Sequence, residues 1–207
     1  MPLRIRPREA RFSDGFSALA THLVAGAHVL AEVLGVDQPG RVELAERMRE
    51  VDQQAEEATH DVLRELAAAF VTPLDRVDVF RLAWGMRLCS RQTDSVIDQV
   101  ALFGMGALPG GVTEQVVLIG RAADLTFDAV PRLGRVRAMS QVWIEMTRLV
   151  KQSGEVHRRL VAGLLVPTAE DDVALERLLR VADGVAAVMA AYEHVADVLE
   201  QIVVKEG

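Results

Sequence analysis

The chain has 207 residues, of which 50% are hydrophobic, 26% charged and only 4% aromatic, a composition typical of one compact domain, or two small ones, built from helices. Its formal net charge of −7 argues against nucleic acid as a partner, because binding to phosphates requires a basic face. The single cysteine, Cys89, excludes an internal disulfide and favours a reducing, cytoplasmic setting.

Residues 1–12 form a short basic arm that carries Arg4, Arg6, Arg8 and Arg11. A solvated chain terminus is the favoured interpretation, and contact with an anionic membrane surface or an acidic partner is the alternative. The arm lacks the apolar segment of a secretory signal. Further along the chain, charged residues interrupt the apolar runs, so we expect no transmembrane helix.

The first long helix is expected to begin at Ser13 or Asp14, either of which can cap it, and to end at Gly35. Two more long helices follow, and in all three the apolar residues recur every three or four positions. These stripes are Phe16, Leu19, Leu23, Ala27, Leu30 and Leu34, then Leu44, Met48, Val51, Ala55, Ala58, Val62, Leu66 and Ala69, then Val79, Leu82, Met86, Cys89, Thr93, Val96, Val100 and Phe103. Such long, narrow stripes are typical of helix bundles.

The second and third predicted helices are joined by a very short connector. Thr72 is a good N-cap and Pro73 suits the first helical position, so one helix is expected to stop and the next to start with almost no loop. The two helices must then fold back against each other. If the turn centres between residues 71 and 72, residues lie at the same height when their numbers sum to about 143.

This register brings charged residues together. It places Asp52 opposite Arg91 and Glu56 opposite Arg87, so that two acids on one helix face two guanidinium groups on the next. The sequence therefore predicts an ion-pair cluster across this interface.

A glycine- and proline-rich segment at 104–111 marks the midpoint of the chain. Three more helices are expected after it, at about 113–133, 137–165 and 168–205. We therefore predict an all-α fold in which a single domain, 1–207, consists of two antiparallel three-helix halves, 13–106 and 112–207.

The segment after the second helix reads FVTPLDRVDV and resembles the "FITPFDREDI" signature of the PhoU-like family that accompanies Pit-type phosphate transporters, often called domain of unknown function family 47. Residues 193–205 are similar to the closing helix of that family and residues 12–34 suit its first helix, so the resemblance spans nearly the whole chain. The signature positions in this sequence are Phe70, Thr72, Pro73, Asp75, Arg76 and Asp78.

The resemblance implies a six-helix PhoU fold and a cytoplasmic role in phosphate uptake or its regulation in a bacterium. Family members carry E/D-x-x-x-D pairs on their helices, and several bind metal-ion clusters there. Asp52 and Glu56 occupy the first pair with the acids interchanged. The other corresponding positions are Arg87, Leu88 and Arg91 in the first half and Val150, Gly154 and Ala190 in the second. The resemblance thus implies that one metal site is erased and that the other has lost half of its carboxylates.

Three interpretations of the charged residues remain open. Asp52, Glu56 and His60 are spaced four apart on one helix face and could offer oxygen and nitrogen ligands to a transition-metal ion. The favoured interpretation is that the two acids pair with Arg87 and Arg91, since two arginines would repel a cation. The arginine forks could instead contact phosphate.

Catalysis finds little support in the sequence. Glu57 and His60 spell the Glu-x-x-His of di-iron helical enzymes, but no second such pair is present. Cys89 falls on a core stripe, and no serine lies in a nucleophile motif. Trp84, near His60, and Trp143 are expected in the core together with the methionines. Asp94 and Asp98 are expected on a solvated face.

We therefore expect a non-enzymatic accessory or regulatory protein of phosphate transport that acts through contacts with a membrane phosphate permease or another regulatory protein. It would be cytoplasmic, or peripheral at the inner face of the membrane through the transporter, without a resident cofactor. Its long amphipathic helices leave a homodimer open. The alternative function is a metal-binding helical bundle that uses Asp52, Glu56 and His60.

Overall fold

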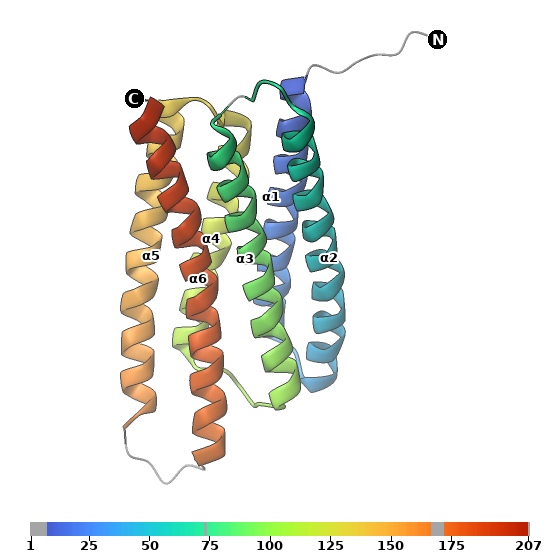
Figure 1. Ribbon diagram of the computed structural model, residues 1–207. Coiled ribbons are helices and arrows are strands. Elements are labelled where there is room, and N and C mark those ends of the chain that lie inside the picture. Colours follow the sequence, from blue (N-terminus) through green and yellow to red (C-terminus); the bar gives the residue numbers. More distant parts are fainter. Residues whose placement is uncertain (1–7, 73, 167–171, 207) are drawn as a thin grey trace.

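The computed structural model describes residues 8–72, 74–166 and 172–206, in which the chain forms six α-helices, one 3₁₀ helix and no strand. The helices lie side by side in one elongated bundle (Figure 1). Their bounds are α1 Arg8–Val33, α2 Gln38–Ala68, α3 Arg76–Phe103, α4 Gly110–Ala129, η1 Val130–Arg132, α5 Val136–Leu164 and α6 Asp172–Glu206. The predicted all-α, six-helix architecture is confirmed.

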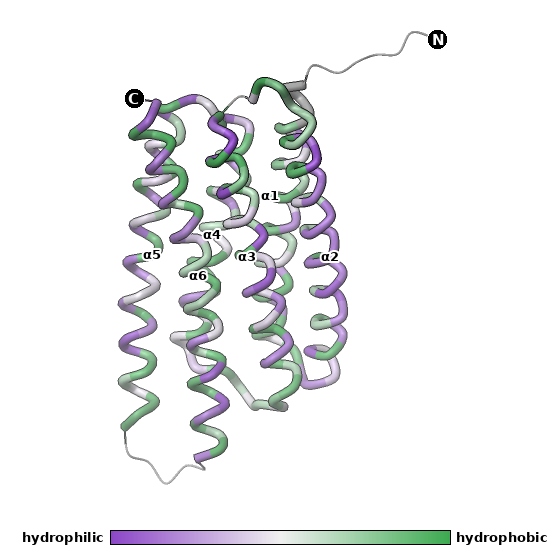
Figure 2. The backbone as a smooth tube through the Cα atoms, viewed as in Figure 1, coloured by the Kyte–Doolittle hydropathy of each residue, from purple (hydrophilic) through white to green (hydrophobic). Residues whose placement is uncertain are grey.

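One hydrophobic core joins helices of both predicted halves. Helix α1 packs against α2, α3 and α4, helix α3 lies between α2 and α6, and α5 packs against α4 and α6. Hydrophilic residues line the outer side of α2, as Figure 2 shows, because that side faces away from the other helices. The division into halves at 13–106 and 112–207 stays a prediction about the origin of the chain.

The predicted apolar stripes form the seams of this core. All their members on α3 from Val79 to Val100 are buried, as are Met48, Ala55 and Val62 on α2. Glycine permits a close approach between α3 and α6, since a Cβ atom at Gly184 would lie 2.9 Å from Cγ2 of Val96. The periodicity of the sequence therefore identified the inward faces correctly.

The boundaries at the start of the chain differ from the prediction. Helix α1 begins at Arg8 and not after Ser13 or Asp14, so residues 8–12 of the predicted arm are helical. The remaining arm residues, 1–7, lie outside the described part of the chain.

The connector between α2 and α3 also differs. Helix α2 ends at Ala68 and α3 begins at Arg76 with Asp75 as its N-cap, whose carboxylate accepts the N–H of Val77 at 2.8 Å. Thr72 as the N-cap is therefore wrong, and Pro73 lies outside the described residues. The carboxylate of Asp75 captures a free amide of the first turn, whereas the Thr72 hydroxyl donates to the carbonyl of Leu74 at 2.6 Å.

In the second half, α4 begins three residues earlier than predicted and stops at Ala129. Pro131, which has no N–H, then lies in the 3₁₀ turn η1, and Gly134 adopts a positive φ of 87° before α5. The predicted start of α6 at Thr168 lies outside the described residues, and its described part begins at Asp172.

One helix tests the expectation that no segment could span a membrane. Residues Phe12–Val33 of α1 are long and apolar enough to do so by length and composition. Half of this window is buried, because α1 contacts three other helices of the bundle. Burial in a core accounts for the same hydropathy, so the segment is weak evidence for a membrane span.

Candidate functional site

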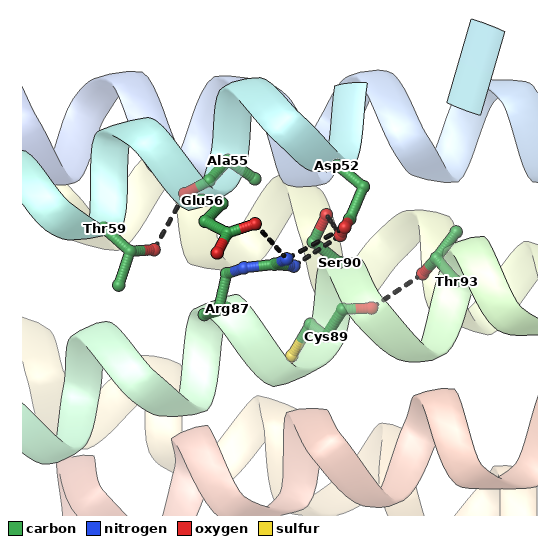
Figure 3. A network of polar contacts seen from close by, with 8 residues as sticks. All are labelled: Asp52, Ala55, Glu56, Thr59, Arg87, Cys89, Ser90 and Thr93. Carbon is green, nitrogen blue, oxygen red and sulfur yellow. Dashed lines mark hydrogen bonds and ion pairs between the residues drawn. The ribbon is translucent and has the colours of Figure 1, made fainter. Parts of the chain in front are cut away.

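Arg87 is the centre of a polar cluster between α2 and α3. Its Nη2 atom donates to Oδ2 of Asp52 at 2.8 Å, and its Nη1 atom donates to the other carboxylate oxygen, so the pair is bidentate. Nη2 also lies 3.4 Å from Oε2 of Glu56. The hydroxyl of Ser90 donates to Asp52 at 2.9 Å (Figure 3). A single guanidinium group therefore serves two acids.

The burial of the cluster is uneven. The side chain of Arg87 is 7% exposed and that of Asp52 17% exposed, whereas that of Glu56 is 53% exposed. Bidentate geometry and low exposure make the contact with Asp52 the stronger one, while water screens the contact with Glu56. The carboxylate of Asp52 needs Arg87 and Ser90, because little water reaches it.

The predicted pairing of Asp52 with Arg91 is wrong. The hydrogen bond between Ser90 and Asp52 shows that the heights were close to correct, since these numbers sum to 142. However, each residue advances roughly 100° around a helix, so Ser90 and Arg91 lie on opposite sides of Arg87. Arg91 is exposed and makes no ion pair with a described residue. Arg87 alone occupies the seam.

Arg91 instead borders a small hollow beside the cluster. Its volume is about 240 Å³, and its lining residues are Glu56, Thr59, His60, Trp84, Arg87 and Arg91. The donors of Arg87 already face Asp52 and Glu56, which leaves Arg91 as the free guanidinium of the hollow. A phosphate contact here stays a prediction, and it now rests on Arg91 alone.

The proposed metal ligands are not gathered around one point. Asp52 directs its carboxylate to Arg87 and Ser90, and His60 is exposed at the rim of the hollow. Across the described residues, no three His, Cys, Asp or Glu side chains come together in a way that could hold a metal ion. The residues therefore do not present the donor set that a transition metal requires.

Asp94 and Asp98 are half-buried rather than on a fully solvated face. Asp98 accepts a hydrogen bond from Arg49 of α2 at 2.8 Å, and this bond raises the pKa of Arg49. Burial raises the pKa of Asp94, and the negative charges of Asp52 and Asp98 raise it further. Negative charge thus continues along α3 beyond the cluster.

The signature residues secure the connector and the end of the chain. Arg76 donates to the carbonyl of Ala69 at 2.8 Å, which satisfies a free carbonyl after α2. Asp78 is buried and accepts two bonds from Nζ of Lys205, at 2.8 and 2.9 Å. The start of α3 is thereby fixed to the end of α6, so these side chains have structural roles.

An exposed aromatic surface on α3 was missed by the sequence prediction, which placed Trp84 in the core. Trp84 is 41% exposed, and its ring meets that of Phe80 edge to face with centroids 6.1 Å apart. Val77 continues this surface in one direction, and a hollow of about 200 Å³ lined by Trp84, Leu88, Arg91 and His194 continues it in the other. We call Val77, Phe80, Trp84, Leu88 and Arg91 the α3 aromatic face.

A sequence signal for this face exists. Val77, Phe80 and Trp84 recur at helical spacing, two residues out of step with the core stripe of Val79, Leu82 and Met86. A second apolar stripe on one helix indicates a second contact.

The other predicted core residues lie where expected. Cys89 and the described methionines are buried, except for Met105, which is partly buried. Trp143 is partly buried against the core.

The comparisons with known proteins agree with this fold. No protein-family model matches the chain. A protein of Rhizobium meliloti (strain 1021) named "Putative pit accessory protein" is 25% identical over 160 residues, which are 75% of this chain and 74% of that protein.

Two crystal structures of PhoU-like proteins from Shewanella oneidensis MR-1 are similar to the bundle. One gives a TM-score of 0.76 at 12% identity and covers 94% of this chain and 99% of its own. The other gives 0.66 at 14% identity and covers 94% and 96%. At these identities the likeness establishes the fold, and the predicted PhoU-like bundle is confirmed.

Proposed function

We propose that this chain, a divergent PhoU-like protein, is a non-enzymatic accessory or regulatory protein of phosphate transport that binds a Pit-type permease. The similarity to the Rhizobium meliloti protein carries this proposal, because it extends over three quarters of both chains. The PhoU-like fold supports it independently, since it covers nearly the whole chain.

The α3 aromatic face is the surface that we assign to the permease. Trp and Arg are the residue types most enriched at binding hot spots, and Trp84 and Arg91 line the same hollow. The side chains of Phe80 and Trp84 are too exposed to be explained by packing within the bundle. Contact with a partner would bury them.

The chemistry of Cys89 supports a role without catalysis. The thiol is fully buried, and burial raises its pKa, so it stays protonated and away from solutes. A regulator that works through protein contacts needs no such nucleophile. Action on a permease places the protein in the bacterial cytoplasm, at the inner face of the membrane.

A pull-down with the purified chain and the Pit-type permease of the same genome tests the proposal. We expect the double variant Phe80→Ala and Trp84→Ala to lose affinity by roughly tenfold or more, because hot-spot aromatics dominate binding. The matched control is Ile144→Ala on α5, an exposed large hydrophobic side chain outside this face. Deletion of the gene should change phosphate uptake.

Two results would reject the proposal: no permease is recovered, and uptake is unchanged in the deletion strain. A second copy of this chain is the alternative occupant of the α3 aromatic face. Light scattering on the purified protein separates the two, since a dimer through this face would dissociate in the double variant and compete with the permease.

The metal-binding alternative is not favoured, because Asp52 is engaged by Arg87 and Ser90. Elemental analysis of protein purified without chelators tests it directly. Iron, zinc or nickel in stoichiometric amount, lost in Asp52→Asn, would reinstate that function. Metal-free protein that still binds the permease would remove it.

A further inference from the structure

One end of the bundle brings together two connectors that are far apart in the sequence. The α2–α3 connector and the η1 turn after α4 both lie at the end where α1 begins (Figure 1). Leu74 and Val79 line one hollow of about 330 Å³ with Val130 and Leu133, together with Phe12 of α1. The two connectors therefore form one continuous surface, which we call the connector end.

Apolar side chains project from the connector end. Phe70 is 93% exposed and Val71 is 74% exposed, and the end of α6 adds Val204 at 74%. These are three of the four most exposed large hydrophobic side chains among the described residues. Such exposure at the tip of a connector is costly in water and indicates a surface that is covered in use.

The two connectors at this end carry more arginines than acids, although the whole chain is acidic and the exposed Asp128 and Glu206 lie just beyond them. Residues 69–77 and 130–137 contain four arginines and one acid, Asp75, which caps α3. Arg132, Arg135 and Arg137 are all exposed, and none forms an ion pair with a described carboxylate. At the same end, Asp78 is neutralised by Lys205.

We propose that the connector end binds the surface of an anionic lipid bilayer. Phe70 and Val71 would enter the boundary between headgroups and acyl chains, while Arg132, Arg135 and Arg137 would pair with lipid phosphates. Stable membrane attachment requires two such signals, an apolar insertion and a basic patch, because either alone gives only weak, reversible binding. The positive charge of the arginines is complementary to the negative charge of such a bilayer. The inference rests on the proposed function and deepens it, because a permease partner is itself embedded in a bilayer.

Sedimentation of the purified full chain with vesicles tests this inference without any permease. Vesicles of phosphatidylcholine with phosphatidylglycerol should bind the protein, and vesicles of phosphatidylcholine alone should not. Replacing Arg132, Arg135 and Arg137 by Gln should lower affinity roughly fivefold for each arginine. The control replaces Arg148, Arg158 and Arg159, which are also exposed and carry the same charge. They lie further along α5, and each pairs with a glutamate.

A second measurement reports insertion of the apolar residues. Phe70→Cys can be labelled selectively with a polarity-sensitive fluorophore, because Cys89 is buried. Its emission should shift to the blue on anionic vesicles. The matched control is Leu102→Cys, 76% exposed at the opposite end of α3, whose emission should not shift.

The outcomes are decisive in both directions. The inference is supported if binding to anionic vesicles requires the connector-end arginines and if the fluorophore emission shifts to the blue at residue 70 but not at residue 102. Absence of binding to anionic vesicles, equal losses in both arginine sets, or equal shifts at both cysteines overturns it. If the connector-end variants bind anionic vesicles as the parent does but no longer bind a detergent-solubilised permease, the surface is a protein interface and the lipid proposal is wrong. Because the permease pull-down targets the α3 aromatic face, failure of one proposal is distinguishable from failure of the other.

Discussion

The α2–α3 and α5–α6 interfaces occupy corresponding places in the two halves, yet they are held together differently. Between α2 and α3, the buried Arg87 joins Asp52 and Glu56. Between α5 and α6, the described residues form a single polar side-chain contact, from His157 to Asp183 at 3.5 Å, and the carboxylate of Asp183 is largely exposed. The second interface therefore depends on apolar packing, and the first also depends on charge.

The difference follows from which positions carry acids. In the second half, the positions that the resemblance assigns to metal ligands hold Val150, Gly154 and Ala190, which need no counter-charge. In the first half, the acids Asp52 and Glu56 are present and Arg87 compensates them. A half-buried acid requires a partner, whereas a small or apolar residue requires only space. Four substitutions test this contrast.

The largest effect is expected from Arg87→Ala. It leaves Asp52 with only Ser90 as a partner, so we expect a loss of about 2 to 4 kcal/mol in the free energy of unfolding, measured by urea denaturation. Replacing Asp52 by Asn in the same chain should recover part of this loss. Equal stability of Arg87→Ala and the parent would show that water already satisfies Asp52.

Lys205→Ala tests whether a second buried acid of α3, Asp78, also destabilises the fold when it loses its basic partner. Asp78 is buried, but Lys205 is half-exposed, so water can partly replace it and we expect a loss of about 1 to 2 kcal/mol. Arg81→Ala is the matched control, because its exposed bond to Gln201 also links α3 to α6. If the control variant lost as much stability, burial of Asp78 would not be the cause.

Asp94→Asn should give a small gain in stability near neutral pH. The pKa of Asp94 is raised, first by burial and then by Asp52 and Asp98, so its ionised form weakens the folded state. This loss is absent below the ordinary aspartate pKa and complete above the raised one. Urea midpoints of variant and parent should therefore differ at neutral pH and converge in acid. A gain independent of pH would indicate helix propensity instead of charge.

The smallest effect is expected from His157→Ala in the α5–α6 interface. The contact with Asp183 is long and its carboxylate is exposed, so the loss attributable to this contact should stay below about 1 kcal/mol. Asp183→Ala isolates that contribution, because it leaves the packing of the imidazole intact. A loss from Asp183→Ala as large as that from Arg87→Ala would contradict the contrast between the interfaces.

Much of the site could be predicted, but not its exact pairing. The contact between Glu56 and Arg87 was expected and is present, and the heights along α2 and α3 were nearly correct. The pairing of Asp52 failed because one residue along a helix turns a side chain to a different neighbour. Thr72 failed as a cap because Asp75, closer to the first turn, offers a carboxylate to the amide of Val77.

The sequence by itself determined the helical architecture, because the spacing of apolar residues is a local property that fixes which face of each helix turns inward. The tertiary structure decided which arginine meets the acids, that Trp84 is partly exposed to solvent, and that the α2–α3 connector shares one end of the bundle with η1. These outcomes depend on how helices and connectors distant in the chain are placed against one another, and periodicity within a single helix carries no information about that placement.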